Sequence, residues 1–236
     1  MSIRGKIKAL RIYTKKALHG LPEITITDLF KRIPQVMDPI LDSICMPPHY
    51  SVTDHDDYTP LMVIARGMEA RLIVELGTAH GNTTANLCRH LPDAKILTVN
   101  APLNLMTGVG TTFSLTEDEI GKVYRAHGFG GRVQQVFANT LDLDLARHIE
   151  PSSADIAIVD ACHDTEYVVN DFHKVRGFVR PGGIVLLHDT HPSMKGHVAT
   201  SYIACMDLRK TGFDMRWLKD TWWGVWTPDW SRFPLA

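Results

Sequence analysis

Short apolar segments recur along the chain from residue 71 onward, and stretches with helical periodicity separate them. Five of these segments are rich in β-branched residues, which predicts buried strands. They cover residues 71–76, 95–100, 132–138, 155–160 and 183–188. Strands that alternate with helices build a parallel sheet covered by helices on both faces, so the pattern predicts a doubly wound α/β fold.

Helices are expected in front of the first strand, between the later strands and after the fifth. The first runs from about 59 to 68 and the last from about 197 to 210. Thr116 and Glu119 have the spacing of a capping box for a helix that continues to Gly128.

The end of the chain changes character. Residues 215–219 (MRWLK) and 222–226 (WWGVW) have the pattern of an antiparallel pair of strands. The expected sheet therefore has seven strands, of which the last two form this pair. The tryptophans of the pair either pack in the core or wall a substrate site.

Residues 1–56 lack the regular alternation and are interrupted by prolines. Ile3, Ile7 and Leu10 recur at helical spacing among basic side chains, which predicts a helix. We expect an N-terminal helical extension that covers the domain or mediates homodimer formation, followed by one domain over 57–236. The basic start, free of acids, leaves an organelle transit peptide open as an alternative.

The composition is that of an ordinary globular protein, with 44% hydrophobic and 22% charged residues. A length of 236 residues supports one good hydrophobic core. The net charge of −1 gives no electrostatic reason to expect binding to nucleic acid or a membrane, and no apolar run is long enough to span a bilayer. The four cysteines are scattered without a CxxC pair, which favours reduced thiols in a cytoplasmic protein.

The turn after the first strand carries the most informative local pattern. Glu75 lies near the end of the strand, where a carboxylate can meet a ligand. Gly77 and Gly81 permit a close approach of the backbone to that ligand, and Asn82 or Thr83 can cap the following helix.

The pattern Glu-x-Gly-x-Ala-x-Gly resembles the first motif of class I methyltransferases that use S-adenosylmethionine (SAM), with Ala79 in place of the usual second glycine. The antiparallel pair at the chain end is similar to the end of those enzymes, whose sheet is Rossmann-like. The resemblance implies that the turn holds the methionine part of SAM through Glu75, Gly77, Thr78, His80, Gly81, Asn82 and Thr83. It also places Asn100 at the ribose and Asn139 near the adenine, where the family usually has acids.

A dinucleotide-binding turn is the competing interpretation. Such a turn requires G-x-G-x-x-G, whereas the glycines here are four residues apart, with Ala79 and Asn82 in the other two places. The neutral Asn100 would suit a phosphorylated ribose, so an NADP(H)-dependent oxidoreductase stays open as an alternative.

Acids and histidines follow the fourth and fifth expected strands. Ligands of open α/β sheets bind at the carboxyl ends of the strands, so Asp160, His163, His188 and Asp189 are candidate site residues. The segments VDACH and LLHD resemble the small-molecule O-methyltransferases, including those of sugars and macrolides, which carry an IDGxH-like segment after strand four.

A hydroxyl acceptor must lose its proton, which suits an imidazole, so His163 is the candidate general base. Asp160 is expected to face the reacting centre and the cofactor. Asp160, Asp189 and His188 are candidate ligands for Mg²⁺, which would bind substrate oxygens and lower the pKa of the acceptor. Each of these residues could also have only a local structural role, but their joint occurrence at two strand ends favours function.

The sequence therefore predicts a SAM-dependent methyltransferase that acts on a small molecule, at a hydroxyl oxygen. A SAM-binding relative with a hydroxylase, cyclase or regulatory role is the second hypothesis. The third is a binding or scaffolding protein with a degenerate pocket.

Overall fold

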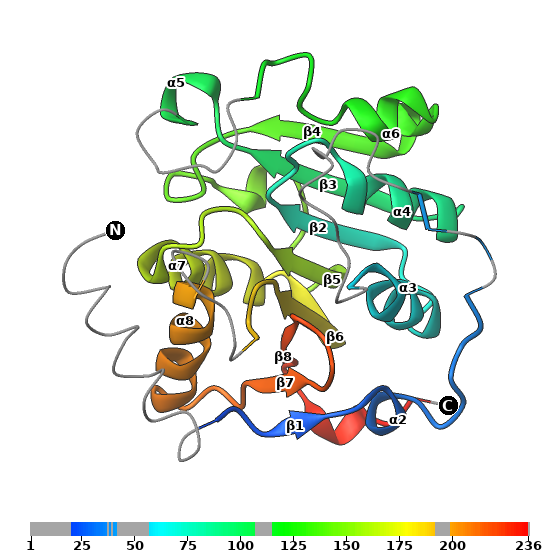
Figure 1. The fold of residues 1–236 in the computed structure, drawn as a ribbon, viewed down its shortest axis with the longest axis vertical. Coiled ribbons are helices and arrows are strands. Elements are labelled where there is room, and N and C mark those ends of the chain that lie inside the picture. Colours follow the sequence, from blue (N-terminus) through cyan, green and yellow to red (C-terminus); the bar gives the residue numbers. More distant parts are fainter. Residues whose placement is uncertain are drawn as a thin grey trace.

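The computed structural model describes residues 20–36, 38, 40–41, 57–106, 115–191 and 199–235. One mixed sheet runs through this part of the chain (Figure 1). Its strands are β1 (Glu23–Ile24), β2 (Leu72–Leu76), β3 (Lys95–Asn100), β4 (Val133–Phe137), β5 (Ala154–Val159), β6 (Val179–Leu187), β7 (Arg216–Leu218) and β8 (Gly224–Trp226). The helices are α2 (Ile26–Leu29), α3 (Tyr58–Gly67), α4 (Asn82–His90), α5 (Leu103–Met106), α6 (Lys122–Ala126), α7 (Thr165–Arg176) and α8 (Ala199–Lys210), with 3-10 turns η1 (Phe129–Arg132), η2 (Leu145–Arg147) and η3 (Trp230–Arg232).

The strand order is β1-β7-β8-β6-β5-β2-β3-β4, and only the pairs that involve β8 are antiparallel. This confirms the doubly wound α/β sheet and the antiparallel terminal pair. All seven expected strands are present, and β1 adds a short eighth at the edge. Trp217 N–H donates to the Pro22 carbonyl and Lys219 N–H to the Ile24 carbonyl, both at 2.8 Å. Two residues are too few for an alternation pattern, so the sequence does not reveal β1.

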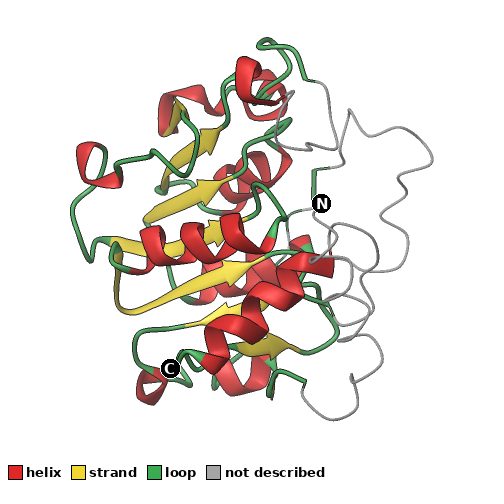
Figure 2. Ribbon diagram, turned by 90° about the vertical axis from the view of Figure 1, so that its left-hand side faces the viewer, coloured by secondary structure: helices red, strands yellow, loops and turns green. Residues whose placement is uncertain are grey.

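Helices cover both faces of the sheet (Figure 2). On one face, α3 and α4 pack over side chains such as Ile73, Ile96 and Ile156. On the other, α7 and α8 pack over side chains such as Val74 and Leu97. Successive strand residues point to opposite faces, so a sheet covered twice needs apolar residues at nearly every position of its central strands.

The described part of the N-terminal region packs into this core. Thr25 caps α2 in a reciprocal capping box with Asp28. Leu29 and Phe30, at the end of α2, are buried in the same apolar cluster as α3. The helix expected from Ile3 lies outside the described residues, and the domain boundary at residue 57 stays a prediction.

Helices α3 and α8 confirm the helices expected in front of β2 and β7. Helix α6 begins later than the capping-box pattern predicts. Thr116 does bond the Glu119 carboxylate, through its N–H at 3.0 Å and its hydroxyl at 3.1 Å. The helix starts only after Gly121, whose φ of +73° interrupts the turn that Thr116 opens.

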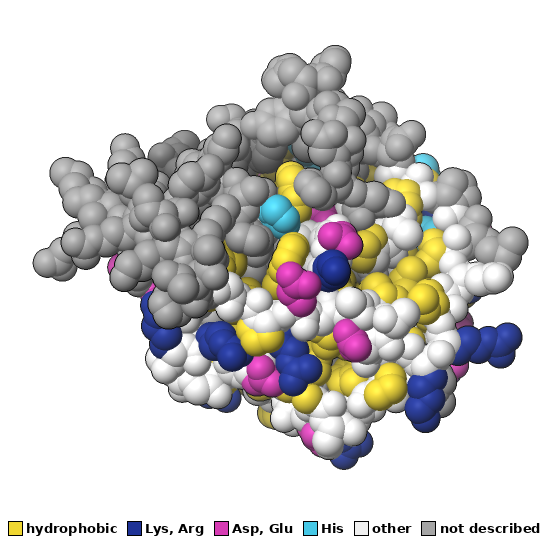
Figure 3. Space-filling view, turned by 60° about the horizontal axis from the view of Figure 1, so that its bottom comes forward, with side chains coloured by type: hydrophobic (Ala, Val, Ile, Leu, Met, Phe, Trp, Pro, Cys, Tyr) yellow, Lys and Arg dark blue, Asp and Glu magenta, His cyan; other side chains and the backbone are white. Residues whose placement is uncertain are grey.

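No helix among the described residues has both the length and the apolar character needed to cross a membrane. On the face seen in Figure 3, acidic and basic side chains are interspersed. At the β1–β7 edge of the sheet, Arg216 pairs with Asp214 at 2.8 Å and Lys219 lies 4.0 Å from Glu23. The charges of these residues are therefore balanced locally.

Candidate active site

Three segments meet at one edge of the sheet, where parallel strands end. Strands β2, β5 and β6 are neighbours in the sheet, so the segments that follow them lie side by side (Figure 1). The turn after β2 starts at Gly77, the loop after β5 at Asp160 and the turn after β6 at His188. This edge is where open α/β sheets bind their ligands.

Gly77 lets the turn after β2 lie against the end of β5. Its φ is +112°, and a Cβ at this position would lie 2.0 Å from the carbonyl oxygen of Asp160. Gly81 has φ +81°, and a Cβ there would lie 2.7 Å from the Tyr124 ring. Both glycines were expected to permit the approach of a ligand, whereas packing within the protein already requires them.

Helix α4 begins without a side-chain cap. Its N-cap residue is Gly81, so the expectation that Asn82 or Thr83 caps the helix is wrong. Asn82 and Thr83 instead form the first helical turn. Because no cap side chain bonds the first N–H groups, this helix start offers donors and a partial positive charge to an anion such as a carboxylate.

Glu75 is buried within the protein at the end of β2, with 1% of its surface exposed. Its carboxylate accepts hydrogen bonds from the hydroxyl groups of Thr84 and Thr98, the latter at 2.5 Å. Burial raises the pKa of Glu75 to about 7, against the effect of these two hydrogen bonds. The carboxylate thus stabilises the turn, because it holds α4 against β3.

This raised pKa makes the stability of the fold depend on pH. Between pH 4.5 and about 7 the folded chain holds a proton on Glu75 that the unfolded chain releases, so the free energy of unfolding falls as pH rises through this window. Glu75→Gln cannot ionise. We expect its free energy of unfolding, relative to wild type, to increase by up to roughly 3 kcal/mol across the window, at 1.36 kcal/mol per pKa unit.

Urea denaturation of the two proteins between about pH 5 and about pH 8 measures this difference. A difference that does not change with pH would contradict the assignment of a raised pKa to Glu75.

Thr78 and His80 are buried in the turn. The hydroxyl of Thr78 lies 2.7 Å from that of Thr98 and accepts a hydrogen bond from Gln135 Nε2 at 2.9 Å. Burial lowers the pKa of His80, which favours its neutral form. The Thr78 side chain therefore ties the turn to β3 and β4.

The two asparagines at the expected nucleoside positions have local partners. Asn100 accepts a hydrogen bond from Ala79 N–H at 3.0 Å and donates to the Ala101 carbonyl at 3.0 Å, so its amide ties β3 to the turn after β2. Asn139, after β4, accepts from Leu141 N–H at 3.2 Å. Both lie at the carboxyl edge of the sheet, as expected, and their contacts with a nucleoside stay a prediction.

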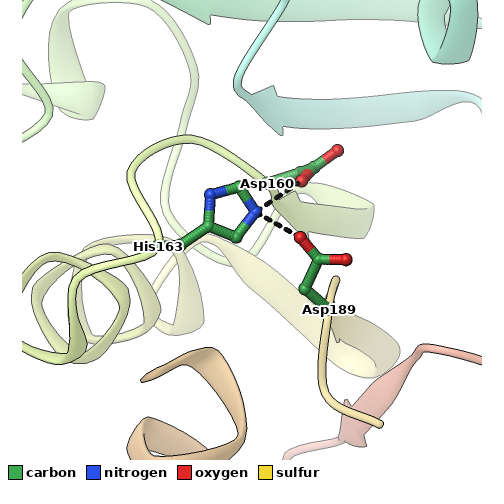
Figure 4. A group of neighbouring side chains, drawn as sticks. All are labelled: Asp160, His163 and Asp189. Carbon is green, nitrogen blue, oxygen red and sulfur yellow. Dashed lines mark ion pairs between the residues drawn. The ribbon is translucent and has the colours of Figure 1, made fainter. Parts of the chain in front are cut away.

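His163 lies between two carboxylates from adjacent strand ends (Figure 4). Its Nε2 is 2.5 Å from Asp189 Oδ2 and 3.7 Å from Asp160 Oδ1. The Thr200 hydroxyl bonds the carbonyl of His163 and thereby fixes the loop to α8. Burial disfavours a charge on His163, but the hydrogen bond to Asp189 and the two carboxylate charges outweigh it and raise its pKa.

His188 contacts the same two carboxylates. Its Nδ1 lies 3.3 Å from Asp160 Oδ1 and 3.5 Å from Asp189 Oδ1, while its Nε2 lies 3.1 Å from Asp57 Oδ2. Burial opposes a charge on this ring, but Asp160, Asp189 and Asp57 together hold its pKa well above the usual range.

Two further residues of this region, Asp57 and Tyr58, lie at the start of α3 and were not predicted from the sequence. The phenol of Tyr58 hydrogen-bonds the Thr83 side chain, and burial together with the Asp160 charge raises its pKa to about 12. Acids near a helix start are common for capping alone. The signal in the sequence was therefore too weak to indicate a contact with the site.

One group of described residues could hold a metal ion: Asp160, His163 and Asp189, with ligand atoms that all lie within 4.8 Å of one another. This group contains two of the three expected ligands. His188 is not part of this group, and its Nε2 pairs with Asp57 instead.

The sheet has the Rossmann-like fold of methyltransferases. Residues 74–190 match the family model described as a methyltransferase domain. The matched segment runs from β2 to the residue after Asp189, so it includes the turn, the loop and both strand ends of the candidate active site. No curated protein matches the chain.

Solved structures with the same fold include O-methyltransferases. A Klebsiella pneumoniae protein proposed to be an O-methyltransferase is 19% identical, covers 94% of this chain and 97% of its own, and has a TM-score of 0.54. A Staphylococcus aureus protein proposed to be a caffeoyl-CoA O-methyltransferase is 12% identical, with 79% and 83% covered and a TM-score of 0.54. The methyltransferase PaMTH1 of Podospora anserina, bound to S-adenosylhomocysteine (SAH), is 14% identical, with 72% and 77% covered and a TM-score of 0.54. At these identities, the likeness shows the fold alone.

Proposed function

We propose that the chain transfers the methyl group of SAM to a hydroxyl oxygen of a small molecule. The observation that carries this proposal is the position of His163. Asp189 and Asp160 hold its ring at the sheet edge, next to the turn that the methyltransferase match covers. A histidine oriented by a carboxylate is a suitable base for a hydroxyl group.

His163 has a defined role in this reaction. Nε2–H donates to Asp189, which leaves the lone pair of the neutral ring on Nδ1. Nδ1 takes the proton of the acceptor hydroxyl while the oxygen forms a bond to the methyl carbon. The carbon–sulfur bond breaks, its electron pair stays on sulfur and SAH is released. The two carboxylates stabilise the imidazolium that results, as in other histidine–carboxylate pairs.

Most of the catalysis in such an in-line displacement comes from positioning. Alignment of two reactants can contribute about 7–11 kcal/mol, and the general base adds roughly 10²–10⁴-fold. The turn after β2 and the uncapped start of α4 are suited to the methionine carboxylate of SAM. Asn100 and Asn139 would bind the ribose and the adenine. The solved PaMTH1 structure supports this choice of cofactor, because the same fold holds SAH there.

The same cluster is the second candidate site, for a divalent cation such as Mg²⁺. Two carboxylates and an imidazole within 4.8 Å are a suitable donor set. Asp160, Asp189 and His163 would hold the ion, which would bind the acceptor oxygen and lower its pKa.

For this metal role, dialysis against a chelator is expected to abolish methyl transfer and added Mg²⁺ to restore it. Full activity after dialysis would dismiss the ion and leave the three residues to general-base catalysis.

Transfer of radiolabelled methyl from SAM to small molecules of a cell extract tests the proposed function. Label in an organic acceptor that survives mild acid and base and is released as methyl iodide by hot hydriodic acid, as expected of a methyl ether, supports it. Binding of SAM without transfer to any acceptor would favour the hydroxylase, cyclase or regulatory relative. Label on nitrogen or carbon would keep the methyltransferase and overturn the oxygen specificity.

A further inference from the structure

Asp57 stands at the start of α3 and connects three elements that are far apart in the sequence. Its Oδ2 lies 3.1 Å from His188 Nε2, after β6. Its Oδ1 accepts the N–H of Trp222 at 2.9 Å, and its carbonyl oxygen accepts the indole N–H of Trp223 at 3.0 Å. Asp57 is 8% exposed, so these contacts form in a largely dry environment, where a hydrogen bond to a charged group is strong.

His188 links Asp57 to the carboxylates of the candidate active site. Through Nδ1 the ring reaches Asp160 Oδ1 at 3.3 Å and Asp189 Oδ1 at 3.5 Å. The other oxygen of Asp189 is the one bonded to His163. The chain of contacts therefore runs from Asp57 through His188 and Asp189 to His163.

The backbone gives a second reason to regard Asp189 as held in place. Its φ is +55°, in the left-handed region that only a minority of non-glycine residues adopt. Such a conformation is strained and persists only where the surroundings determine it. Asp189 is buried, and both of its carboxylate oxygens face histidines.

We propose that Asp57 and His188 are positioning residues, which act through Asp189 and Asp160 to fix the orientation of His163. Asp57 fixes the ring plane of His188, and the Trp223 ring, with its centroid 4.5 Å from that of His188, supports the plane from one side. His188 then holds the two carboxylates toward His163. This role rests on the proposed function, since it gives His163 the geometry that a base requires.

The variant Asp57→Asn tests this role with little change in shape. Its amide oxygen can still accept the Trp222 N–H, while the group that faces His188 is no longer charged. Asp155→Asn is the matched control. Asp155 is equally buried (8% exposed), accepts hydrogen bonds from two backbone N–H groups and pairs with Arg180. It lies near the N-terminal end of β5, whereas the candidate active site lies at the C-terminal ends of the strands.

Proton NMR of ¹⁵N-histidine-labelled protein gives a readout that does not depend on turnover. Imidazole N–H protons bonded to carboxylates resonate far downfield, and His163→Gln and His188→Gln assign them. We expect downfield signals from both rings in wild type and in Asp155→Asn. In Asp57→Asn the His188 signal should be lost or moved, and the His163 signal should move with it. The His163 signal should also move in His188→Gln, which serves if Asp57→Asn fails to fold.

An unchanged His163 signal in both Asp57→Asn and His188→Gln would overturn the proposal, as would the absence of downfield signals in wild type. Where methyl transfer is measurable, Asp57→Asn should lower kcat about 10–100-fold at unchanged SAH affinity, the loss typical of a group that orients a catalytic residue. Normal NMR signatures in a protein that transfers no methyl group would refute the proposed function and leave the positioning contacts intact.

Discussion

His163→Ala is expected to lower the rate of methyl transfer by roughly 10²–10⁴-fold while the affinity for SAH stays nearly unchanged. The ring supplies the base, and the structure places it on the loop after β5, next to the turn that would hold the methionine part of the cofactor. Loss of the imidazole removes proton transfer and leaves the cofactor contacts in place. Turnover with radiolabelled SAM and calorimetric titration with SAH measure the two quantities.

His173→Ala is the control, because His173 is exposed on α7, the helix that follows the same loop. In wild type the rate should rise with pH through the raised pKa of His163, since only the neutral ring accepts a proton. His163→Ala should lack this rise. A variant that keeps the wild-type kcat would remove His163 as the base.

Gly77→Ala is expected to lower the free energy of unfolding by roughly 2–6 kcal/mol, as the sum of backbone strain and overpacking. The new Cβ would lie 2.0 Å from the Asp160 carbonyl oxygen, which is backbone and cannot rotate away. The end of β5 must move, and Asp160 moves with it. SAH binding should weaken in the same variant, because the turn and the loop after β5 shift together.

Gly212→Ala separates the two contributions. Gly212 has a similar φ of +103°, but nothing lies within 4 Å of the position that its Cβ would take. This variant should lose only the strain, of order 1–3 kcal/mol, and keep its SAH affinity. Equal losses in the two variants, measured by urea denaturation, would show that the contact between Gly77 and the end of β5 is not tight.

The sheet could be predicted from the sequence because its central strands are covered on both faces. Strand β5, for example, is buried at all six positions, and its residues 156–159 form an apolar run that no surface helix would show. Strand β1 could not be predicted, since two residues carry no periodicity. The late start of α6 depends on the left-handed Gly121, a backbone conformation that the capping-box pattern does not reveal.

That Asp160, His163 and Asp189 lie close together could be predicted from the sequence, because topology alone brings strand ends to one edge. The roles of Glu75 and Asn100 were harder to predict. Both lie at strand ends, where a ligand could contact them. Yet Glu75 bonds Thr84 and Thr98 within the protein, and Asn100 bonds the backbone of Ala79 and Ala101. Which of two faces a strand-end side chain takes depends on packing partners that only the folded chain brings together.

The contact between Asp57 and His188 could not be predicted from the sequence either, for the same reason. Asp57 lies 131 residues before His188 in the sequence and contacts it only after β6 and α3 have packed on the same sheet. The spacing of polar residues along one element gives no indication of such a pair. Contacts between elements therefore set the orientation of the cluster, whereas the sequence pattern sets its location.

Calorimetric titration of the purified protein with SAH, with NADP⁺ as the comparison ligand, is the most direct test of a SAM-dependent methyltransferase. We expect that SAH binds and NADP⁺ does not, because the turn after β2, with its glycines four residues apart and the uncapped start of α4, suits the methionine part of the cofactor. Binding of NADP⁺ alone, or of neither ligand, would contradict a SAM-dependent methyltransferase.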